Sequence, residues 1–161
     1  MGIEVKRSMM KETEKEGRVM KNIIAITDES GGFCSLAARA VAYAGHAAYA
    51  SMRKTTGRNA HQVKEVEEYA TAHAVDLLHA IELDVSSQES LDATVNTIII
   101  TSENSHLNVV IHNAGHIVFG PTEAFAPEQS AQLYDRNVLL MQRVNRAALS
   151  YFCAQGKGVN D

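Results

Sequence analysis

The stretch NIIAITDESGGFCSLAARAVAYAG, residues 22–45, decides the fold. It opens with the apolar run Ile23–Ile26, which is short and rich in β-branched residues, as in a strand buried on both faces. A small polar turn with two glycines follows. Residues 33–44 are rich in alanine and carry apolar side chains at helical spacing, and Gly45 is a natural C-terminal stop. The stretch therefore predicts a strand, a glycine-bearing turn and a helix.

This order favours the first unit of a nucleotide-binding α/β fold. The first N–H groups of a helix have no partner within the helix, so they can face a diphosphate. By itself the Gly31-Gly32 turn is a weak signal, because many α/β proteins have such a turn. The alternative is a plain turn in which Ser30 caps the helix.

The rest of the chain continues the alternation. Further strands are expected at 47–51, 77–85 and 108–111, and helices at 60–74, 88–101 and 127–154. Ser86 and Glu89 stand in capping-box relation before the third helix. The last helix is expected to turn inward the stripe Leu133, Asn137, Met141, Val144, Ala148 and Tyr151.

Alternating strands and helices with right-handed crossovers predict an α/β fold, a doubly wound parallel sheet covered by helices on both faces. We expect one such domain over residues 20–161 and a charged, flexible extension over residues 1–19. The chain has 161 residues, which suits one domain but is short for a complete dinucleotide enzyme.

Composition excludes several classes of protein. A net charge of -4 argues against a nucleic-acid-binding protein, and no apolar stretch approaches the roughly 20 residues that cross a bilayer. Two cysteines and the lack of an apolar signal segment indicate a reducing, cytoplasmic location. His112 and His116 are four residues apart on a predicted strand end and loop, a spacing that does not favour zinc. We expect no metal.

Four patterns stand in register along the chain: residues 27–34, Leu83-Asp84-Val85, Asn113-Ala114-Gly115, and Asn137 in the last helix. Together they resemble the short-chain dehydrogenase/reductase family from about Met20 to the chain end. The family turn T-G-x-x-x-G-x-G is matched at Thr27 and Gly32, and the family N-A-G turn is intact although His112 replaces an Asn that often precedes it. The resemblance implies a Rossmann-like sheet with strand order 3-2-1-4. It also implies an NAD(P)-dependent oxidoreductase that transfers hydride between the cofactor and a carbonyl or alcohol.

The expected cofactor is NADP(H). Dinucleotide folds that select NAD place a carboxylate after the second strand, whereas residues 51–54 contain Arg53 and no acid. In the family, the residue matching Asp84 accepts from the adenine amino group. The expected cofactor-binding residues are Thr27, Ser30, Gly32, Phe33, Ser51, Arg53, Lys54, Asp84, Val85, Asn113, Ala114 and Gly115. The alternatives are a basic surface loop for Arg53 and a strand-ending aspartate for Asp84.

Asn137 has two interpretations. In the family, the corresponding Asn helps to hold a water in the catalytic proton relay. A buried amide on an apolar stripe also needs hydrogen-bond partners, so the alternative is a purely structural residue that locks a backbone kink.

Three residues depart from the family turn and predict weak cofactor binding. Asp28 and Glu29 place carboxylates near the diphosphate, and at about 5 Å and an effective dielectric of about 20 one such charge costs roughly 3 kcal/mol. Cys34 replaces a glycine that lets helix and strand pack closely. Cys34 is expected to be a buried small residue, the alternative being a nucleophile activated by the helix terminus.

The family's catalytic Tyr-x-x-x-Lys has no counterpart, because none of the five tyrosines has a lysine four residues later. We therefore expect an inactive chain, a fragment or early-terminated version of the oxidoreductase. The alternative is a noncatalytic nucleotide-binding or dimerising half-fold. With strand order 3-2-1-4, Val109–Ile111 forms an exposed apolar edge. We therefore expect dimerisation into a homo-oligomer or other pairing through that edge, aggregation, or marginal stability.

Overall fold

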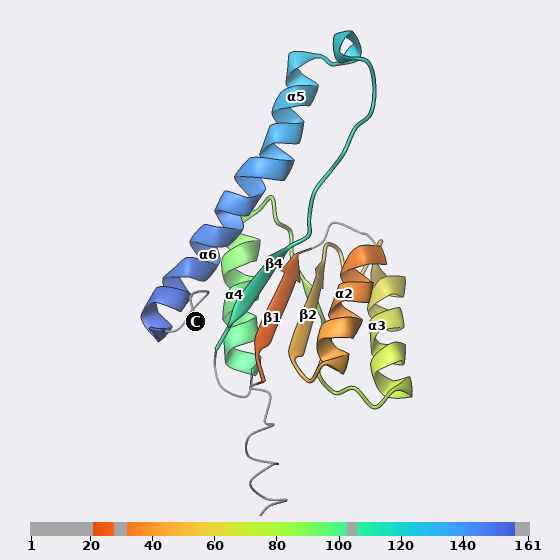
Figure 1. Cartoon of the computed structure of the whole chain (residues 1–161), viewed down its shortest axis with the longest axis vertical. Helices are drawn as coiled ribbons and strands as arrows, with labels where there is room; N and C mark the ends of the chain where they lie inside the picture. The colour runs from red at the N-terminus through yellow and green to blue at the C-terminus, as the bar shows by residue number, and fades with distance from the viewer. Residues whose placement is uncertain (1–20, 28–31, 103–105, 157–161) are drawn as a thin grey trace, which may run out of the picture.

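The structure, a computed structural model, describes residues 21–27, 32–102 and 106–156. Its centre is a parallel sheet built from β1 (Ile23–Thr27), β2 (Ala47–Met52), β3 (Leu78–Glu82) and β4 (Val109–His112). The strands lie in the order β3-β2-β1-β4, as Figure 1 shows, so the predicted order 3-2-1-4 is confirmed. In the sheet register Ile24 of β1 lies opposite Ala48 of β2 and Val109 of β4.

Helices α2 (Gly32–Tyr43) and α3 (Ala60–Ala72) cover one face of this sheet. The side chains that α2 buries against the sheet are small, namely Cys34, Ala38 and Ala42, and they pack with larger side chains of β1 and β2 such as Ile26 and Met52. The helix ends at Tyr43, and Gly45, the predicted stop, follows it with a φ of +89°, a left-handed conformation that glycine adopts without strain.

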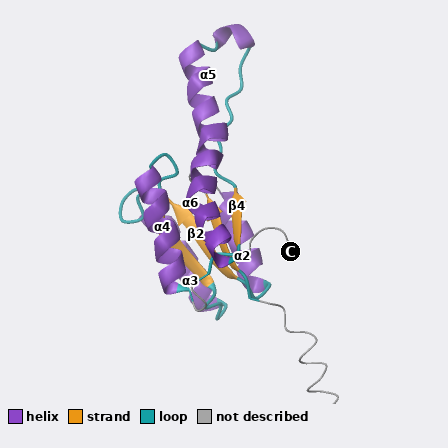
Figure 2. Ribbon diagram, turned by 90° about the vertical axis from the view of Figure 1, so that its left-hand side faces the viewer, coloured by secondary structure: helices purple, strands orange, loops and turns teal. Residues whose placement is uncertain are grey.

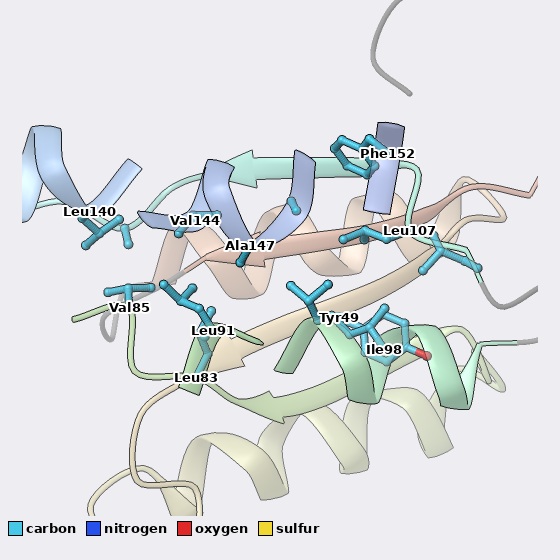
Figure 3. Packing of buried hydrophobic residues seen from close by; sticks show 14 of the residues in the cluster. Tyr49, Leu83, Val85, Leu91, Ile98, Leu107, Leu140, Val144, Ala147 and Phe152 are labelled. Atoms are coloured by element: carbon cyan, nitrogen blue, oxygen red, sulfur yellow. The ribbon is translucent and has the colours of Figure 1, made fainter. Parts of the chain in front are cut away.

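Helices α4 (Gln88–Thr101) and α6 (Leu140–Gln155) cover the opposite face. Figure 3 shows how their larger side chains, among them Leu91, Ile98 and Val144, meet Tyr49 of β2 in a second core. Leu91, Ile98 and Leu140 are among the largest side chains that are fully enclosed. The doubly wound arrangement with helices on both faces is thus present, and the α/β prediction is confirmed.

The start of α4 differs from the prediction. Ser87, not Ser86, is the N-cap, and its hydroxyl accepts from the Ser90 N–H at 3.2 Å. The Ser86 N–H and hydroxyl instead donate to Asp84 Oδ1 at 3.0 and 2.5 Å. The predicted capping box with Glu89 is wrong because Asp84 binds Ser86 in a local turn, which moves the helix start one residue along.

The last helix is not continuous α-helix. It consists of α5 (Pro127–Tyr134), a π-helical segment η2 (Asp135–Leu139) and α6. Its buried side chains are Leu140, Val144, Ala147, Ala148 and Phe152. The prediction that Met141 lies on the buried stripe is wrong, because Met141 is 42% exposed. After Asn137 the next inward-facing residue is Leu140, three residues later, instead of Met141, four residues later. Single π-helical turns are frequent at functional sites.

An arm projects beyond the sheet at the end where the strand arrows point. It comprises the loop after β4, a short 3₁₀ turn η1 (Thr122–Ala124) and α5, and it stands clear of the sheet in both Figure 1 and Figure 2. Large apolar side chains on the arm are exposed, including Ile117 at 74% and Phe119 at 91%. Among the described residues no helix is long and apolar enough to cross a membrane.

Candidate functional site

Parallel strands bring their carboxyl ends to one edge of the sheet. Thr27 ends β1, Arg53 follows β2, Asp84 follows β3 and the turn Asn113–Gly115 follows β4. In open α/β sheets, ligands bind outside this edge where the strand order reverses, which here is between β1 and β4. These four strand ends therefore converge on the position at which this fold binds ligands.

The Thr27 hydroxyl links two of these patterns directly. It accepts from the backbone N–H groups of Asn113 at 3.1 Å and Ala114 at 3.2 Å, and it lies 3.4 Å from the Ile111 carbonyl, to which it donates. A hydroxyl has one donor and two acceptor positions, so this side chain uses its full capacity while only 2% exposed. Thr27 thereby fixes the start of the turn after β4 against the end of β1.

The described part of α2 begins at Gly32. Among the described residues, a Cβ placed on Gly32 would meet no atom within 4 Å, and the first turn of α2 contains no acidic residue. A helix N-terminus without a neighbouring carboxylate on its own first turn suits a diphosphate. Phe33 is 81% exposed, so its side chain lies outside the core. Ser30, together with Asp28 and Glu29, lies outside the described residues.

The loop after β2 is ordered by Asn59, which sequence reasoning missed. Its buried amide Nδ2 donates to the Arg53 carbonyl at 2.5 Å, and its N–H donates to the Lys54 carbonyl at 3.2 Å. Arg53 is half-buried and Lys54 is exposed, with φ at +52°. Asparagine directly before a helix was a signal for a turn residue, but nothing in the sequence showed that its side chain reaches back to Arg53.

Ser51 differs from its neighbours in placement. It is 2% exposed, and its hydroxyl donates to the Ile26 carbonyl of β1 at 2.9 Å. Its side chain therefore lies between the strands, whereas Arg53 and Lys54 lie beyond the strand end. Val85 is likewise fully buried in the core, which leaves its backbone at the sheet edge.

Asp84 is held in its ionised form. The hydrogen bond from the Ser86 hydroxyl is the main cause that lowers the pKa of Asp84, and partial burial opposes it. The Ser86 N–H and the positive charges of Arg53 and Lys54 lower this pKa further. The loops after β2 and β3 are thus electrostatically coupled, with a carboxylate beside two cations.

A cleft of about 450 Å³ lies between these loops and the last helical segment. Arg53 and Ser86 line its sheet side. The helical side is lined by Ala131, Gln132, Asp135, Arg136, Leu140 and Arg143. None of the helical residues was predicted, because charged side chains on an amphipathic helix have the pattern of an ordinary solvated face.

Asn137 lies in the π-helical segment and binds the loop after β4. Its Oδ1 accepts from the His116 N–H and its Nδ2 donates to the His116 carbonyl, both at 2.8 Å. A Cβ on Gly115 would come within 3.3 Å of the same Oδ1. The structural interpretation of Asn137 therefore has direct support in these contacts, while the relay water stays a prediction.

The other candidate residues lie away from this chemistry. Cys34 is 2% exposed, with its sulfur 4.0 Å from the Ile26 carbonyl, which fits the buried small residue that we expected. His112 Nε2 lies 3.0 Å from Asn145 Oδ1 on α6. Within the described part of the chain, no three His, Cys, Asp or Glu side chains come together as a metal site would require.

The chain is similar to known proteins in sequence and in fold. A family model described as short chain dehydrogenase matches residues 22–159. A search of curated proteins gave no match. Solved structures are similar in fold, among them a short chain dehydrogenase from Mycobacterium smegmatis, with a TM-score of 0.69 at 21% identity, covering 84% of this chain and 53% of that one.

Two further structures agree. Serine dehydrogenase from Escherichia coli has a TM-score of 0.69 at 20% identity. The match covers 84% of this chain and 58% of the serine dehydrogenase chain. A gluconate 5-dehydrogenase from Burkholderia cenocepacia, in complex with NADP and tartrate, has a TM-score of 0.69 at 20% identity. The match covers 86% of this chain and 52% of the gluconate 5-dehydrogenase chain. The chain thus spans about half the length of the structures it matches, and this level of identity shows the fold.

Proposed function

We propose that the edge of the sheet formed by the carboxyl ends of its strands binds NADP(H), as the nucleotide-binding part of an oxidoreductase. The chain belongs to the short-chain dehydrogenase/reductase family. The hydride would pass between NADPH and a carbonyl or alcohol substrate. The observation that carries the proposal is the Thr27 hydroxyl, which joins the end of β1 to the Asn113–Gly115 turn beside the N-terminal end of α2. This contact supports the proposal, because it joins Thr27 of one family motif to the turn that forms the other.

The residues present fit the parts of a dinucleotide. The N-terminus of α2 at Gly32 suits the diphosphate. The ionised Asp84 is suited to accept from the adenine amino group, and Asn113–Gly115 would border the ribose and nicotinamide side. Bound NADPH would supply the hydride. This chain's own residues bind and orient it, and the contact of Asn137 with His116 holds the loop that borders it.

The preference for NADP over NAD rests on the loop after β2. Arg53 and Lys54 supply two positive charges there, and no carboxylate lies between residues 51 and 54 to hold a ribose 2′-hydroxyl. The gluconate 5-dehydrogenase structure is a complex with NADP. We propose weak binding, because Asp28 and Glu29 belong to the diphosphate turn.

Fluorescence titration of the 161-residue chain with NADPH and NADH tests this proposal. We expect NADPH to bind at least about tenfold more tightly, since a hydrogen bond to a charged group is worth roughly 1.5–3 kcal/mol. Arg53→Gln should abolish the difference. The matched control Arg58→Gln, an exposed arginine of the same loop that does not line the cleft, should preserve it. Equal affinity for the two cofactors, or no binding of either, would contradict the proposal.

A second candidate function is a noncatalytic nucleotide-binding or pairing module. It is favoured by the lack of any tyrosine with a lysine four residues later, because that lysine lowers the pKa of the proton-donating phenol in the family. An assay of NADPH oxidation with a panel of aldehydes and ketones separates the two functions. We expect no turnover by these 161 residues, and measurable reduction of any carbonyl would establish an enzyme.

A further inference from the structure

Positive charge is concentrated on both walls of the cleft beside Asp84. Arg53 stands on the sheet side, and Arg136 and Arg143 stand on the helical side. Asp135 is the one carboxylate among the described residues that line the cleft. Three arginines against one aspartate give the cleft an excess of positive charge, which suits an anionic ligand.

The single carboxylate is engaged by one particular arginine. Arg143 Nη2 donates to Asp135 Oδ1 at 2.6 Å, and this hydrogen bond is the main cause that lowers the pKa of Asp135. The positive charge of Arg136 also lowers this pKa. The Asp135–Arg143 pair therefore bridges the π-helical segment and α6, and Arg136 adds a further positive charge to the same wall of the cleft.

The cleft also has an apolar part. Ala131 is exposed and lies one helical turn before Asp135, so it adds alkyl surface to the arginines of the helical wall. Leu140 also lines the cleft but is only 2% exposed. A purine needs an apolar or guanidinium surface for its ring faces, and a phosphate on its ribose needs fixed donors. The two walls provide these features at the adenosine end of the proposed cofactor site.

We infer that Arg136 is a second arginine for the adenosine 2′-phosphate, facing Arg53 across the cleft. This inference rests on the proposed NADP(H) site and extends it from the sheet edge to the helix. Selectivity for the phosphate would then depend on a helical residue as well as on the loop after β2. Asp135 limits the affinity, because its charge opposes the phosphate while Arg143 neutralises it only in part.

Calorimetric titration of the full 161-residue chain with 2′,5′-ADP and with 5′-AMP tests the assignment. Both probes carry adenosine and a 5′-phosphate, and only the first carries the 2′-phosphate. We expect Arg136→Gln to raise the Kd of 2′,5′-ADP about tenfold and that of 5′-AMP less than about twofold, as for loss of one charge-assisted hydrogen bond. Arg146→Gln, an exposed arginine of α6 outside the cleft, is the matched control and should change neither.

A variant that is expected to tighten binding distinguishes a specific effect from misfolding, because a misfolded variant would bind more weakly. Asp135→Asn should tighten 2′,5′-ADP by roughly threefold, because it removes a negative charge from the cleft and releases Arg143. Arg136→Lys should retain part of the discrimination, since the charge remains but the planar fork is lost. Equal weakening of both probes by Arg136→Gln would mean a merely structural role and would overturn the inference.

Different results would refute the NADP(H) site and the role of Arg136. If the unsubstituted chain binds 2′,5′-ADP no better than 5′-AMP, the NADP(H) site itself is refuted and Arg136 with it. If 2′,5′-ADP is preferred, and Arg53→Gln removes the preference while Arg136→Gln leaves it intact, the site stands and the role of Arg136 is refuted.

Discussion

At the scale of single residues, the Thr27 hydroxyl does the most to assemble the candidate site. The side chain satisfies two N–H groups of the turn after β4 while it is buried. Sequence analysis singled out Thr27 because it matches a family motif. The bond to Asn113, 86 residues away, could not be read from the sequence, because no local pattern tells which distant backbone group a threonine will meet.

Replacing Thr27 with valine should therefore destabilise the fold. The substitution keeps the shape but leaves the N–H groups of Asn113 and Ala114 without their acceptor, at a cost of about 1–3 kcal/mol. Urea unfolding followed by circular dichroism measures the change. The control Thr97→Val, on the exposed side of α4, should shift the free energy of unfolding by less than about 0.5 kcal/mol. A stability loss no larger than that of the control would refute the role of Thr27.

Asp84 yields a prediction for pH. Since its pKa in the folded chain is lowered chiefly by Ser86, the ionised carboxylate stabilises the fold above its unfolded pKa of about 4. That stabilisation is lost as the pH falls through the lower folded pKa. Ser86→Ala should raise the pKa of Asp84 and make stability less sensitive to pH below about 4.

Carbon-detected NMR titration of the aspartate carboxyls measures this shift. Ser150→Ala, which removes a hydroxyl bound within α6, is the control and should leave the pKa of Asp84 unchanged. An unchanged Asp84 titration in Ser86→Ala would show that the Ser86 N–H and the neighbouring cations, and not the Ser86 hydroxyl, hold the carboxylate ionised.

The helical residues of the cleft mark the limit of prediction at this scale. Arg53 was found because loops after the second strand select the cofactor in this kind of fold. Arg136 and Arg143 come from a helix whose charged positions look like any solvent-facing surface. Their proximity to Arg53 depends on how α5 and α6 cross the sheet edge, and a sequence pattern does not contain that angle.

At the scale of elements, apolar periodicity located each described β-strand and α-helix but not the 3₁₀ turn η1, and it extended the third strand to residue 85 although β3 ends at Glu82. The runs Ile23–Ile26 and Val109–Ile111 were clear because both are continuous apolar sequence, although only β1 is largely buried and β4 is partly buried at the edge of the sheet. The failures were local competitions between hydrogen bonds. Ser86 binds Asp84 and therefore does not cap α4. Residues Asp135–Leu139 form a π-helix, which the spacing of apolar residues does not predict.

The π-helical segment should depend on Asn137. Asn137→Ala removes both hydrogen bonds to His116, so we expect a loss of about 1–3 kcal/mol in the free energy of unfolding. It should also speed proteolysis within residues 116–126, because the loop loses its attachment to the helix. Gln142→Ala, on the exposed side of α6, is the control. Unaltered cleavage of the loop would mean that Asn137 does not hold it.

At the scale of the whole molecule, the strand order follows from the sequence, and the arm does not. Right-handed crossovers and the family resemblance specified β3-β2-β1-β4. The direction in which α5 leaves the sheet has no sequence signature. Among the described residues no strand pairs with the free side of β4, and the arm exposes Ile117 and Phe119.

We predict that the chain associates in solution. An open strand edge and exposed apolar side chains both favour contact with another chain. Sedimentation velocity over a hundredfold range of concentration should show a species heavier than the monomer that increases with concentration. Ile117→Ser combined with Phe119→Ser should leave this species in place if β4 mediates the contact. A single monomeric boundary at all concentrations, with high thermal stability, would refute the prediction.

The two cores differ in when their residues leave the ribosome. Every fully buried member of the core between the sheet and helices α2 and α3 lies before residue 79, whereas the opposite core needs Leu140, Val144 and Phe152. A nascent chain can thus bury the core beside α2 and α3 before Leu140, Val144 and Phe152 have been synthesised. One side of the newly made β1 then stays unpaired until β4, more than eighty residues later in the chain, has been made.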